Sequence, residues 1–327
     1  MNPAQTSFPR LVGDIGGTHA RFAMVQAADS AATDIARYRC ADFASIGDAL
    51  QRYLIEHARV QPRACALGVA TPIEGDCVRL TNSNWSFSIR ELQAQLGVQR
   101  LLVLNDFTTL ALALPALSAT ELRQVGGAAP VAGAPMGLIG PGTGLGVSGL
   151  LPVPGGHGQV AIGGEGGHVT LASFDEDEAA VLACLQKDFG HVSAERALSG
   201  PGLENLYRGV LQVEGGDTTP RAAHEITQAA LDGSDARCVR ALTMFCSLLG
   251  QVAGNVALTL GARGGVYIGG GIVPRLGEWF DRSPFRQRFE AKGRFAGYLE
   301  KIPVFVVQSE VSPALIGASR ALDVMAA

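Results

Sequence analysis

Short apolar runs alternate along the chain with longer runs in which apolar residues recur every three or four positions. Residues 64–69 and 101–104 are apolar runs of strand length, whereas residues 46–58 place Leu50 and Leu54 on one helical face. A chain whose strands alternate with helices is typical of α/β architecture. The pattern therefore predicts an α/β protein.

Two strand pairs are predicted around glycine turns. Residues 10–15 and 20–25 flank a turn at residues 16–18. Residues 137–140 and 146–150 flank a second, glycine-rich turn in the same way. Because a strand rather than a helix follows the glycines in both places, each segment is predicted to be a hairpin.

The remaining elements follow the same two patterns. Further helices are expected at residues 108–114 and 237–262 and from residues 175, 272 and 312, and further strands at 266–268 and 303–307. No low-complexity linker separates the two halves of the chain. A soft domain boundary is expected near Pro115, where the first α/β unit ends.

Composition and charge narrow the class of protein. The chain has 327 residues, 47% of them hydrophobic and 17% charged, which is a globular composition. The net charge is −4 and there is no run of basic residues, so nucleic acid and anionic membranes are not expected partners.

The location of the protein is predicted from three absences in the sequence. The six cysteines form no CxxC pair, which favours reduced thiols in a reducing compartment. The first residues lack the pattern of a signal peptide. Glycine, proline or charge interrupts every long apolar stretch, so no membrane span is expected and the cytoplasm is the predicted location.

Three glycine turns have the composition needed to approach a nucleotide, because residues without a Cβ let backbone N–H groups reach phosphate oxygens. The first adds Asp14, a carboxylate suited to hydrated Mg²⁺, and the first two add Thr18 and Thr143 as hydroxyl donors. The third is expected at a helix N-terminus, which favours anions. The turns are Gly13–Thr18, Gly140–Gly146 and Gly269–Gly271.

Neither common phosphate-loop motif explains the first turn. It lacks the lysine and the following helix of a Walker loop, and a strand follows its glycines where a dinucleotide fingerprint has a helix. A single glycine turn of this kind more often only reverses the chain and binds no nucleotide. The order of the three turns is similar to that of the two phosphate loops and the adenosine loop of the actin–hexokinase–Hsp70 ATPase superfamily, and this resemblance favours a nucleotide site.

Asp106 is the best candidate for the base that a kinase needs to accept the proton of its substrate hydroxyl. It follows the buried strand at residues 101–104, at the carboxyl end where ligands of α/β proteins collect, and Asn105 beside it offers an amide to hydroxyl groups. The local sequence fits a helix N-cap equally well.

A second polar cluster combines Glu165 with His168, and Glu195 is a third element. The glycines around Glu165 argue against the helix that a Glu-x-x-His metal site requires, so sugar hydroxyls are the better ligands. His168 could instead be a structural histidine bonded to the backbone. Glu195 could instead be a solvated acid in the first turn of a helix. The acidic run at residues 175–178 is expected to open a helix and face solvent.

The whole chain resembles bacterial glucokinases of the enterobacterial type, within the actin–hexokinase–Hsp70 ATPase superfamily. The resemblance runs from Leu11 to the predicted C-terminal helix, and its ordered set of motifs is highly specific. The motifs are Gly13–Thr18, Thr81-Asn82, Trp85–Ser88, Asn105–Phe107, Gly142–Gly146, Gly164–Val169, His191–Arg196, Leu198–Gly202, Gly269–Arg275 and Lys292–Phe295.

This resemblance implies a two-domain actin-like ATPase (ribonuclease H-like) α/β fold with a cleft between the domains. The small domain would comprise residues 1–116 completed by helix 308–327, and the large domain residues 117–307. It also implies ATP and Mg²⁺ as cofactors, glucose as substrate, and a homodimer.

The resemblance assigns a role to each candidate residue. Asp106 would be the general base on the sugar 6-hydroxyl, and Asp14 would hold Mg²⁺ through water. Glucose would be held by Asn105, Asp106, Glu165, His168 and Glu195. The nucleotide would be held by Gly13, Asp14, Ile15, Gly16, Gly17, Thr18, Gly142, Thr143, Gly144, Gly269, Gly270 and Gly271.

Three positions depart from the family pattern. His19 replaces the asparagine that commonly follows the first turn, and residues 152–160 and 309–315 also differ. The related ROK sugar kinases carry a cysteine-rich zinc motif that this chain lacks, so no zinc is expected.

The expected activity is ATP-dependent phosphorylation of D-glucose to glucose 6-phosphate. The nearest alternative is a kinase for another hexose, such as fructose or mannose. A non-catalytic sugar-binding sensor and an actin-like ATPase scaffold belong to other classes. The retained Asp14, Asp106 and Thr143 argue against a sensor, and so does the start of the chain close to the first predicted strand.

Overall fold

The computed structural model describes residues 7–28, 30–81, 84–153, 155, 158–215, 219–309 and 311–324. Asn82 and parts of the divergent segments 152–160 and 309–315 lie outside these residues. The chain forms two compact units. The first consists of Met1–Ser118, Leu150–Gly164 and Ser309–Ala327, and the second of Ala119–Gly149 and Glu165–Gln308.

The first unit is built on a five-stranded sheet with the order β3-β2-β1-β4-β7. Its strands are β1 (Arg10–Ile15), β2 (His19–Val25), β3 (Thr33–Arg39), β4 (Ala64–Val69) and β7 (Arg100–Asn105), joined by α1 (Ile46–His57), α2 (Ile89–Leu96), α3 (Asp106–Ala113) and α12 (Pro313–Val324). A separate hairpin pairs β5 (Cys77–Arg79) with β6 (Ser86–Ser88).

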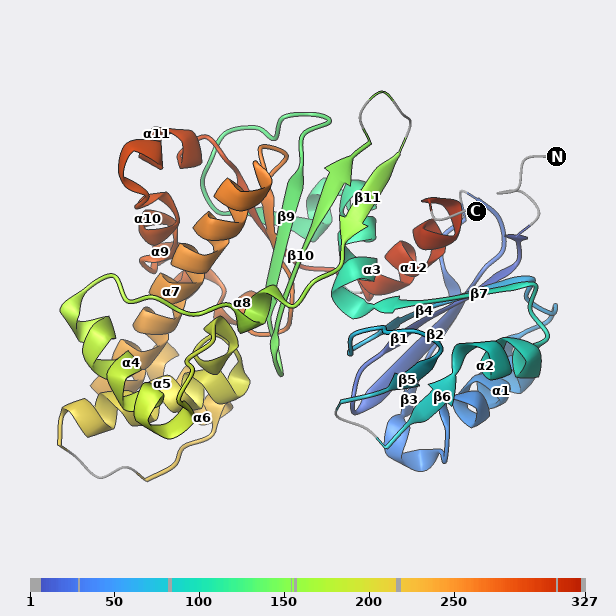
Figure 1. Ribbon diagram of the computed structural model, residues 1–327, viewed down its shortest axis with the longest axis horizontal. Helices are drawn as coiled ribbons and strands as arrows, with labels where there is room; N and C mark the ends of the chain where they lie inside the picture. Colours follow the sequence, from blue (N-terminus) through green and yellow to red (C-terminus); the bar gives the residue numbers. More distant parts are fainter. Residues whose placement is uncertain are drawn as a thin grey trace. The chain divides into compact units, whose positions relative to one another are not determined.

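Helices cover both faces of this sheet, α1 and α2 on one side and α3 and α12 on the other (Figure 1). The alternation of β2 explains the two layers. Phe22 belongs to the core beneath α1, whereas Ala23 packs with Val12 and with Leu315 of α12. Strands β1, β4 and β7 run parallel, and Ile15, Val69 and Asn105 pair in register at their carboxyl ends.

The close contact between α12 and α3 depends on Gly317. A Cβ built on Gly317 would lie 1.6 Å from the backbone oxygen of Thr109, so no larger residue fits without separating the helices. We expect Gly317→Ala to destabilise the protein by about 1–3 kcal/mol, the usual cost of overpacking, measured as a lower urea midpoint. Gly297→Ala, which meets no atom within 4 Å, is the control. A Gly317 variant as stable as the control would contradict this account.

The second unit contains a six-stranded sheet with the order β11-β10-β9-β12-β13-β8, whose β11 (Gln159–Ile162) belongs by its contacts to the first unit. The strands are β8 (Leu122–Gln124), β9 (Met136–Pro141), β10 (Leu145–Pro152), β12 (Val266–Ile268) and β13 (Val304–Val307). The α-helices are α4 (Glu176–Phe189), α5 (Gly200–Val213), α6 (Ala223–Leu231), α7 (Ala236–Leu260), α8 (Val273–Leu276), α9 (Glu278–Arg282), α10 (Phe285–Glu290) and α11 (Ala296–Leu299).

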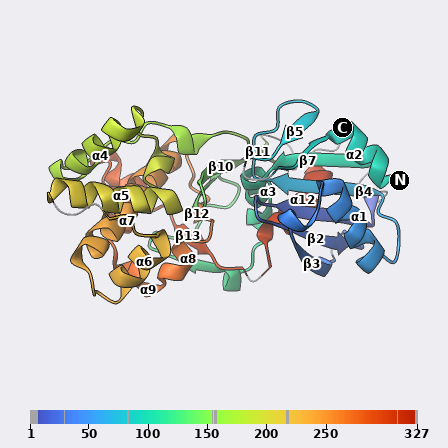
Figure 2. The ribbon, with the colours of Figure 1, turned by 90° about the horizontal axis from the view of Figure 1, so that it is seen from below.

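Helix α7 is the centre of the second unit. It packs against α5, α6 and α10, and α4, α5 and α7 lie beside one another in both views (Figures 1 and 2). One 18-residue window of α7 is apolar enough to cross a membrane, but 72% of that window is buried inside the protein. Gly250 and Gly254 interrupt this run, as the sequence indicated, but they add no polarity, so the window still passes by length and composition. Its burial identifies α7 as a core helix.

The structure confirms both predicted hairpins, since β1 pairs antiparallel with β2 and β9 is followed by β10 around the turn at residues 142–144. It corrects the acidic run: α4 does begin after the N-cap Asp175, but Glu178 is buried instead of facing solvent. By their contacts, residues 150–164 group with the first unit, whereas the resemblance implied a place in the large domain.

Candidate functional site

The Gly13–Thr18 turn is held by His19, the first residue of β2, and by Cys40, the residue that follows β3. Gly16 donates its N–H to the carbonyl of His19 at 2.9 Å, which closes the β1–β2 hairpin. Cys40 donates its N–H to the carbonyl of Thr18 at 2.9 Å, and its Sγ lies 3.4 Å from the carbonyl oxygen of Gly16. Thr18 itself remains exposed, so the turn presents its hydroxyl-bearing side to solvent.

Asp14 is engaged by two residues that sequence reasoning missed. Its Oδ2 accepts a hydrogen bond from Arg21 at 3.1 Å and another from the Ser312 hydroxyl at 2.7 Å. Arg21 is the direct cross-strand partner of Asp14 in the hairpin, so the strand register could have revealed it. Ser312 comes from the far end of the chain, and no local pattern indicates this contact. Together they fix the carboxylate at the end of β1.

Asn105 caps α3, which was one of the two predictions for the Asn105–Asp106 pair. Its Oδ1 accepts from the N–H groups of Phe107 and Thr108 at 2.9 and 3.3 Å. Its Nδ2 lies 3.4 Å from the carbonyl oxygen of Thr71. An amide nitrogen carries two hydrogens, so the second can still be donated to a ligand.

Asp106 is the first residue of α3, and its Oδ1 accepts from the N–H of Phe107 at 2.9 Å. The side chain is half-buried. Because β1, β4 and β7 are parallel and in register, Asp106 and the Gly13–Thr18 turn leave the same edge of one sheet. Two strand spacings separate β1 from β7, which is roughly 10 Å.

The second and third glycine turns, Gly140–Gly146 and Gly269–Gly271, lie next to each other in the second unit. Strands β9 and β12 are parallel, and Gly269 donates to the carbonyl of Ile139 at 2.8 Å. The turn after β9 closes through a bond of 2.8 Å from the N–H of Gly142 to the carbonyl of Gly144. Thr143, at its tip, is exposed. The two turns therefore form one glycine-rich edge.

Gly270 is required by this arrangement. Its φ of +77° is a left-handed conformation, and a Cβ there would lie 2.3 Å from the carbonyl oxygen of Pro141. Helix α8, which follows the turn, has only four residues. The turn does precede a helix, as expected, but that helix contributes little charge at its N-terminus, because a helix of one turn has few aligned peptide dipoles. Any contact with a nucleotide would depend on close backbone approach.

Glu195 lies against the second glycine turn. Its Oε2 accepts from the N–H of Leu145 at 2.8 Å and would lie 2.5 Å from a Cβ on Gly144. It belongs to the 3₁₀ segment η6 (Ala194–Arg196). The alternative of a solvated first-turn acid is excluded, since the carboxylate is tied to the turn.

Glu165 and His168 are brought to the same place by the 3₁₀ segment η5 (Gly166–His168). This segment contacts η6, and Ala194 donates its N–H to the carbonyl of Val169 at 2.9 Å. Both side chains are exposed and make no hydrogen bond among the residues that the structure describes. The second unit thus gathers Glu165, His168 and Glu195 beside the glycine-rich edge.

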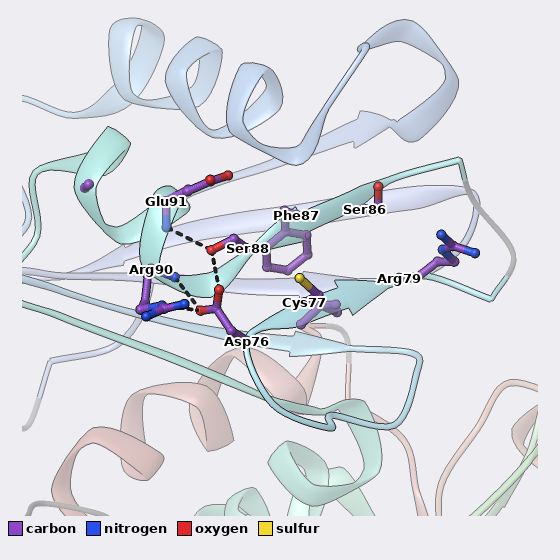
Figure 3. A pocket seen from close by; sticks show the side chains of 10 residues that line it. Asp76, Cys77, Arg79, Ser86, Phe87, Ser88, Arg90 and Glu91 are labelled. Carbon is purple, nitrogen blue, oxygen red and sulfur yellow. Dashed lines mark hydrogen bonds and ion pairs between the residues drawn. The ribbon is translucent and has the colours of Figure 1, made fainter.

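A groove of about 920 Å³ lies elsewhere, along β5, β6 and the start of α2 (Figure 3). In it Ser88 donates to Asp76 at 2.6 Å, and Arg90 pairs with the same carboxylate. None of the predicted site residues lines this groove. Its size therefore does not make it the candidate active site.

Among the described residues, no group of three or more His, Cys, Asp or Glu side chains could hold a metal ion. The single carboxylate of Asp14 nevertheless fits Mg²⁺, which keeps most of its water and takes one or two carboxylates beside substrate phosphates. The donor set therefore suits a hydrated ion and not a protein cage.

Known proteins are similar to this chain over nearly its whole length. The glucokinase family model matches residues 11–325. A glucokinase of Aromatoleum aromaticum is 55% identical over 318 residues, covering 97% of this chain and 95% of that relative. The crystal structure of a glucokinase from an Antarctic psychrotroph superposes with a TM-score of 0.89 at 35% identity, covering 96% of this chain and 98% of that one.

More distant structures share the fold. A glucokinase from Balamuthia mandrillaris, solved in complex with glucose, has a TM-score of 0.74 at 20% identity and covers 96% of this chain and 93% of that one. The family match and the high identity over nearly the whole length confirm the resemblance read from the motifs. The chain belongs to the glucokinase family, the enzymes that phosphorylate glucose with ATP.

Proposed function

We propose that Asp106 is the general base of ATP-dependent glucose phosphorylation and that the Gly13–Thr18 turn binds the phosphates of ATP. The observation that carries this proposal is the shared edge of the first sheet. The turn follows β1 and Asp106 follows β7, and the two strands are held in register through β4. A carboxylate and a phosphate-binding turn at one sheet edge suit transfer of a phosphoryl group to a hydroxyl.

In the proposed reaction the bonds that form and break belong to glucose and ATP, and the protein itself accepts one proton. The sugar 6-hydroxyl oxygen forms a bond to the terminal phosphorus of ATP, the bond from that phosphorus to the ADP oxygen breaks, and Asp106 accepts the hydroxyl proton. Asn105 keeps the start of α3 in place through its cap and offers its remaining amide hydrogen to the sugar. Positioning and charge stabilisation are the main contributions a protein makes to phosphoryl transfer.

The nucleotide would be held by backbone groups of all three turns, with Thr18 and Thr143 donating their hydroxyls to phosphate oxygens. Asp14, fixed by Arg21 and Ser312, would hold a hydrated Mg²⁺. That ion supplies charge neutralisation at the phosphates when it is bound. Gly269–Gly271 would lie by the adenosine, where the absence of side chains leaves room for its ring.

Glucose would be recognised by Glu165, His168 and Glu195 together with the Asn105–Asp106 pair. The free hydrogen-bonding capacity of Glu165 and His168 supports this role, because neither side chain is used by the described part of the fold. Glu195 uses one oxygen for Leu145 and keeps the other for a hydroxyl. Glu195 would thus couple the sugar contacts to the second phosphate turn.

Three further proposals concern organisation. The domains are residues 1–116 with 308–327, and residues 117–307; the contact-defined units support this except for residues 150–164. The resemblance to glucokinases supports a homodimer. Six free cysteines and the burial of α7 support a reducing, cytoplasmic location.

Glu195→Gln tests the assignment of the sugar site. Glutamine can still accept from the N–H of Leu145, but it loses the charge-assisted bond to glucose, which contributes about 1.5–3 kcal/mol. We expect the KM for glucose to rise by about 10–100-fold in a coupled assay of ADP production, with the KM for ATP little changed. Glucose should be the preferred substrate of the wild type over mannose and fructose.

The control is Glu176→Gln, an exposed acid in the first turn of α4, which should leave both constants unchanged. If the glucose KM of the Glu195 variant stayed within about twofold of the wild type, Glu195 would not bind the sugar. If wild-type enzyme released ADP equally fast with mannose or fructose as with glucose, the substrate assignment would be too narrow.

A further inference from the structure

The β2–β3 pair carries four basic residues on one face. His19 pairs directly with Arg39 across the two strands, and Arg21 pairs directly with Arg37. Residues two apart on a strand and cross-strand partners share a face, so all four side chains point to the same side of the sheet. We call these four residues the basic face. Asp14, the partner of Arg21 on β1, lies on that side too.

The basic face is unfavourable for folding. Like charges directly opposite each other on neighbouring strands, as in the pair of Arg21 with Arg37, destabilise a sheet. Asp14 pairs with Arg21, but Arg37 and Arg39 are exposed and have no ion pair within the described residues. Burial and the positive charges of Arg37, Arg21 and Arg39 lower the pKa of His19, so this imidazole adds less positive charge to the basic face than the arginines do. A bound ligand of opposite charge would relieve this repulsion.

The position of the basic face indicates the class of ligand. His19 directly follows Thr18, so the face begins where the first phosphate turn ends. Arg37 and Arg39 are spaced roughly 7 Å along β3, and Arg21 lies roughly 5 Å from Arg37 across the strands. Arginine binds phosphate through two parallel N–H donors. A linear anion that repeats its charge can contact both ends of the face, whereas one orthophosphate cannot.

We propose that the basic face binds a linear condensed inorganic phosphate, an anion of several consecutive phosphoryl groups. Because Arg21 is shared with Asp14 of the phosphate turn, the bound anion would compete with ATP. This consequence rests on the proposed role of the Gly13–Thr18 turn, but binding itself does not. The protein would then respond to condensed phosphate as an inhibitor of its own reaction.

A purely structural role for Arg37 and Arg39 predicts a different result from phosphate binding. β3 is an edge strand of the five-stranded sheet, and charged side chains on an edge prevent pairing with other chains. If that were their only role, removing Arg37 and Arg39 would promote association without affecting the binding of any phosphate.

The test is the double variant Arg37→Gln/Arg39→Gln, titrated with inorganic triphosphate by isothermal calorimetry and compared with orthophosphate. Wild type should bind triphosphate about tenfold or more tightly than the double variant, because charge-assisted bonds are lost. Orthophosphate should show no such difference. In the coupled assay the inhibition constant of triphosphate against ATP should rise in parallel, with the KM for ATP unchanged within about twofold.

The control is Arg59→Gln/Arg90→Gln, which removes two exposed arginines of the same unit and the same net charge. If triphosphate binding were weakened equally in this control, the effect would come from the net charge of the protein and not from the basic face, and the proposal would be overturned. Unchanged triphosphate binding in the Arg37/Arg39 variant would also overturn it, as would a matching rise in the KM for ATP, which would assign the face to the nucleotide. Circular dichroism should show the double variant folded and at least as stable as wild type, since like-charge repulsion is relieved.

Discussion

Replacing Asp106 by asparagine should lower kcat for glucose phosphorylation by about 10²–10⁴-fold, the usual contribution of a general base. Asparagine has nearly the same shape, and its side-chain oxygen can still accept from the N–H of Phe107, so the start of α3 should remain intact. It cannot accept the hydroxyl proton. The loss should therefore appear in kcat, with the KM for glucose changed far less, in steady-state measurements of coupled ADP release.

Asp48→Asn is a matched control for this experiment. Asp48 also lies in the first turn of a helix in the first unit, so its replacement removes the same charge from a comparable helix terminus. It should leave kcat within about twofold of wild type. An Asp106→Asn enzyme that kept more than about a tenth of wild-type kcat would remove Asp106 from the role of general base.

Removing the carboxylate of Glu178 should destabilise the protein by about 3–5 kcal/mol, because the buried Arg288 would keep only its longer ion pair with the exposed Asp175, at 3.6 Å. The Arg288 Nη2 donates to both carboxylate oxygens of Glu178, at 2.7 and 2.9 Å, and to Gln251 at 3.1 Å. The side chain of Glu178 is only 4% exposed and that of Arg288 only 8%. We expect Glu178→Ala to lower the urea midpoint followed by circular dichroism.

Two further variants test whether the loss of stability in Glu178→Ala comes from the buried charge of Arg288 that is left without Glu178. Asp177→Ala removes the neighbouring acid, which is about half exposed and pairs with Arg240, and should cost less than about 1 kcal/mol. Glu178→Leu/Arg288→Met removes both charges and should recover most of the lost stability. A Glu178→Ala protein as stable as the Asp177 variant would show that this ion pair does not support the second unit.

The hairpins and the buried strands were predictable because their signals are local. A strand that follows Gly16 and Gly17 excludes a Walker loop from the sequence alone, and the structure confirms the hairpin. The short buried strands were recognisable from their apolar runs. Helix α7 was predicted to within two residues at each end.

Local patterns failed where the partner of a residue comes from a distant part of the chain. Glu178 looked like a solvated acid at a helix start, but Arg288, 110 residues away, buries it. Glu195 fitted the same description until the hydrogen bond from Leu145 placed it against a glycine turn. The length of α8 also escaped prediction, because its four residues are followed by Gly277, whose φ of +53° ends the helix.

The sequence by itself determined the α/β class, the three glycine turns and the family, since these depend on residue order and on short-range conformational preferences. Only the tertiary structure decided which of these residues meet. The parallel register of β1, β4 and β7 brings the first turn and Asp106 to one sheet edge, and the contact of η5 with η6 gathers Glu165, His168 and Glu195. Cross-strand pairing likewise created the basic face, because arginines 16 and 18 residues apart in sequence become neighbours only when β2 and β3 pair.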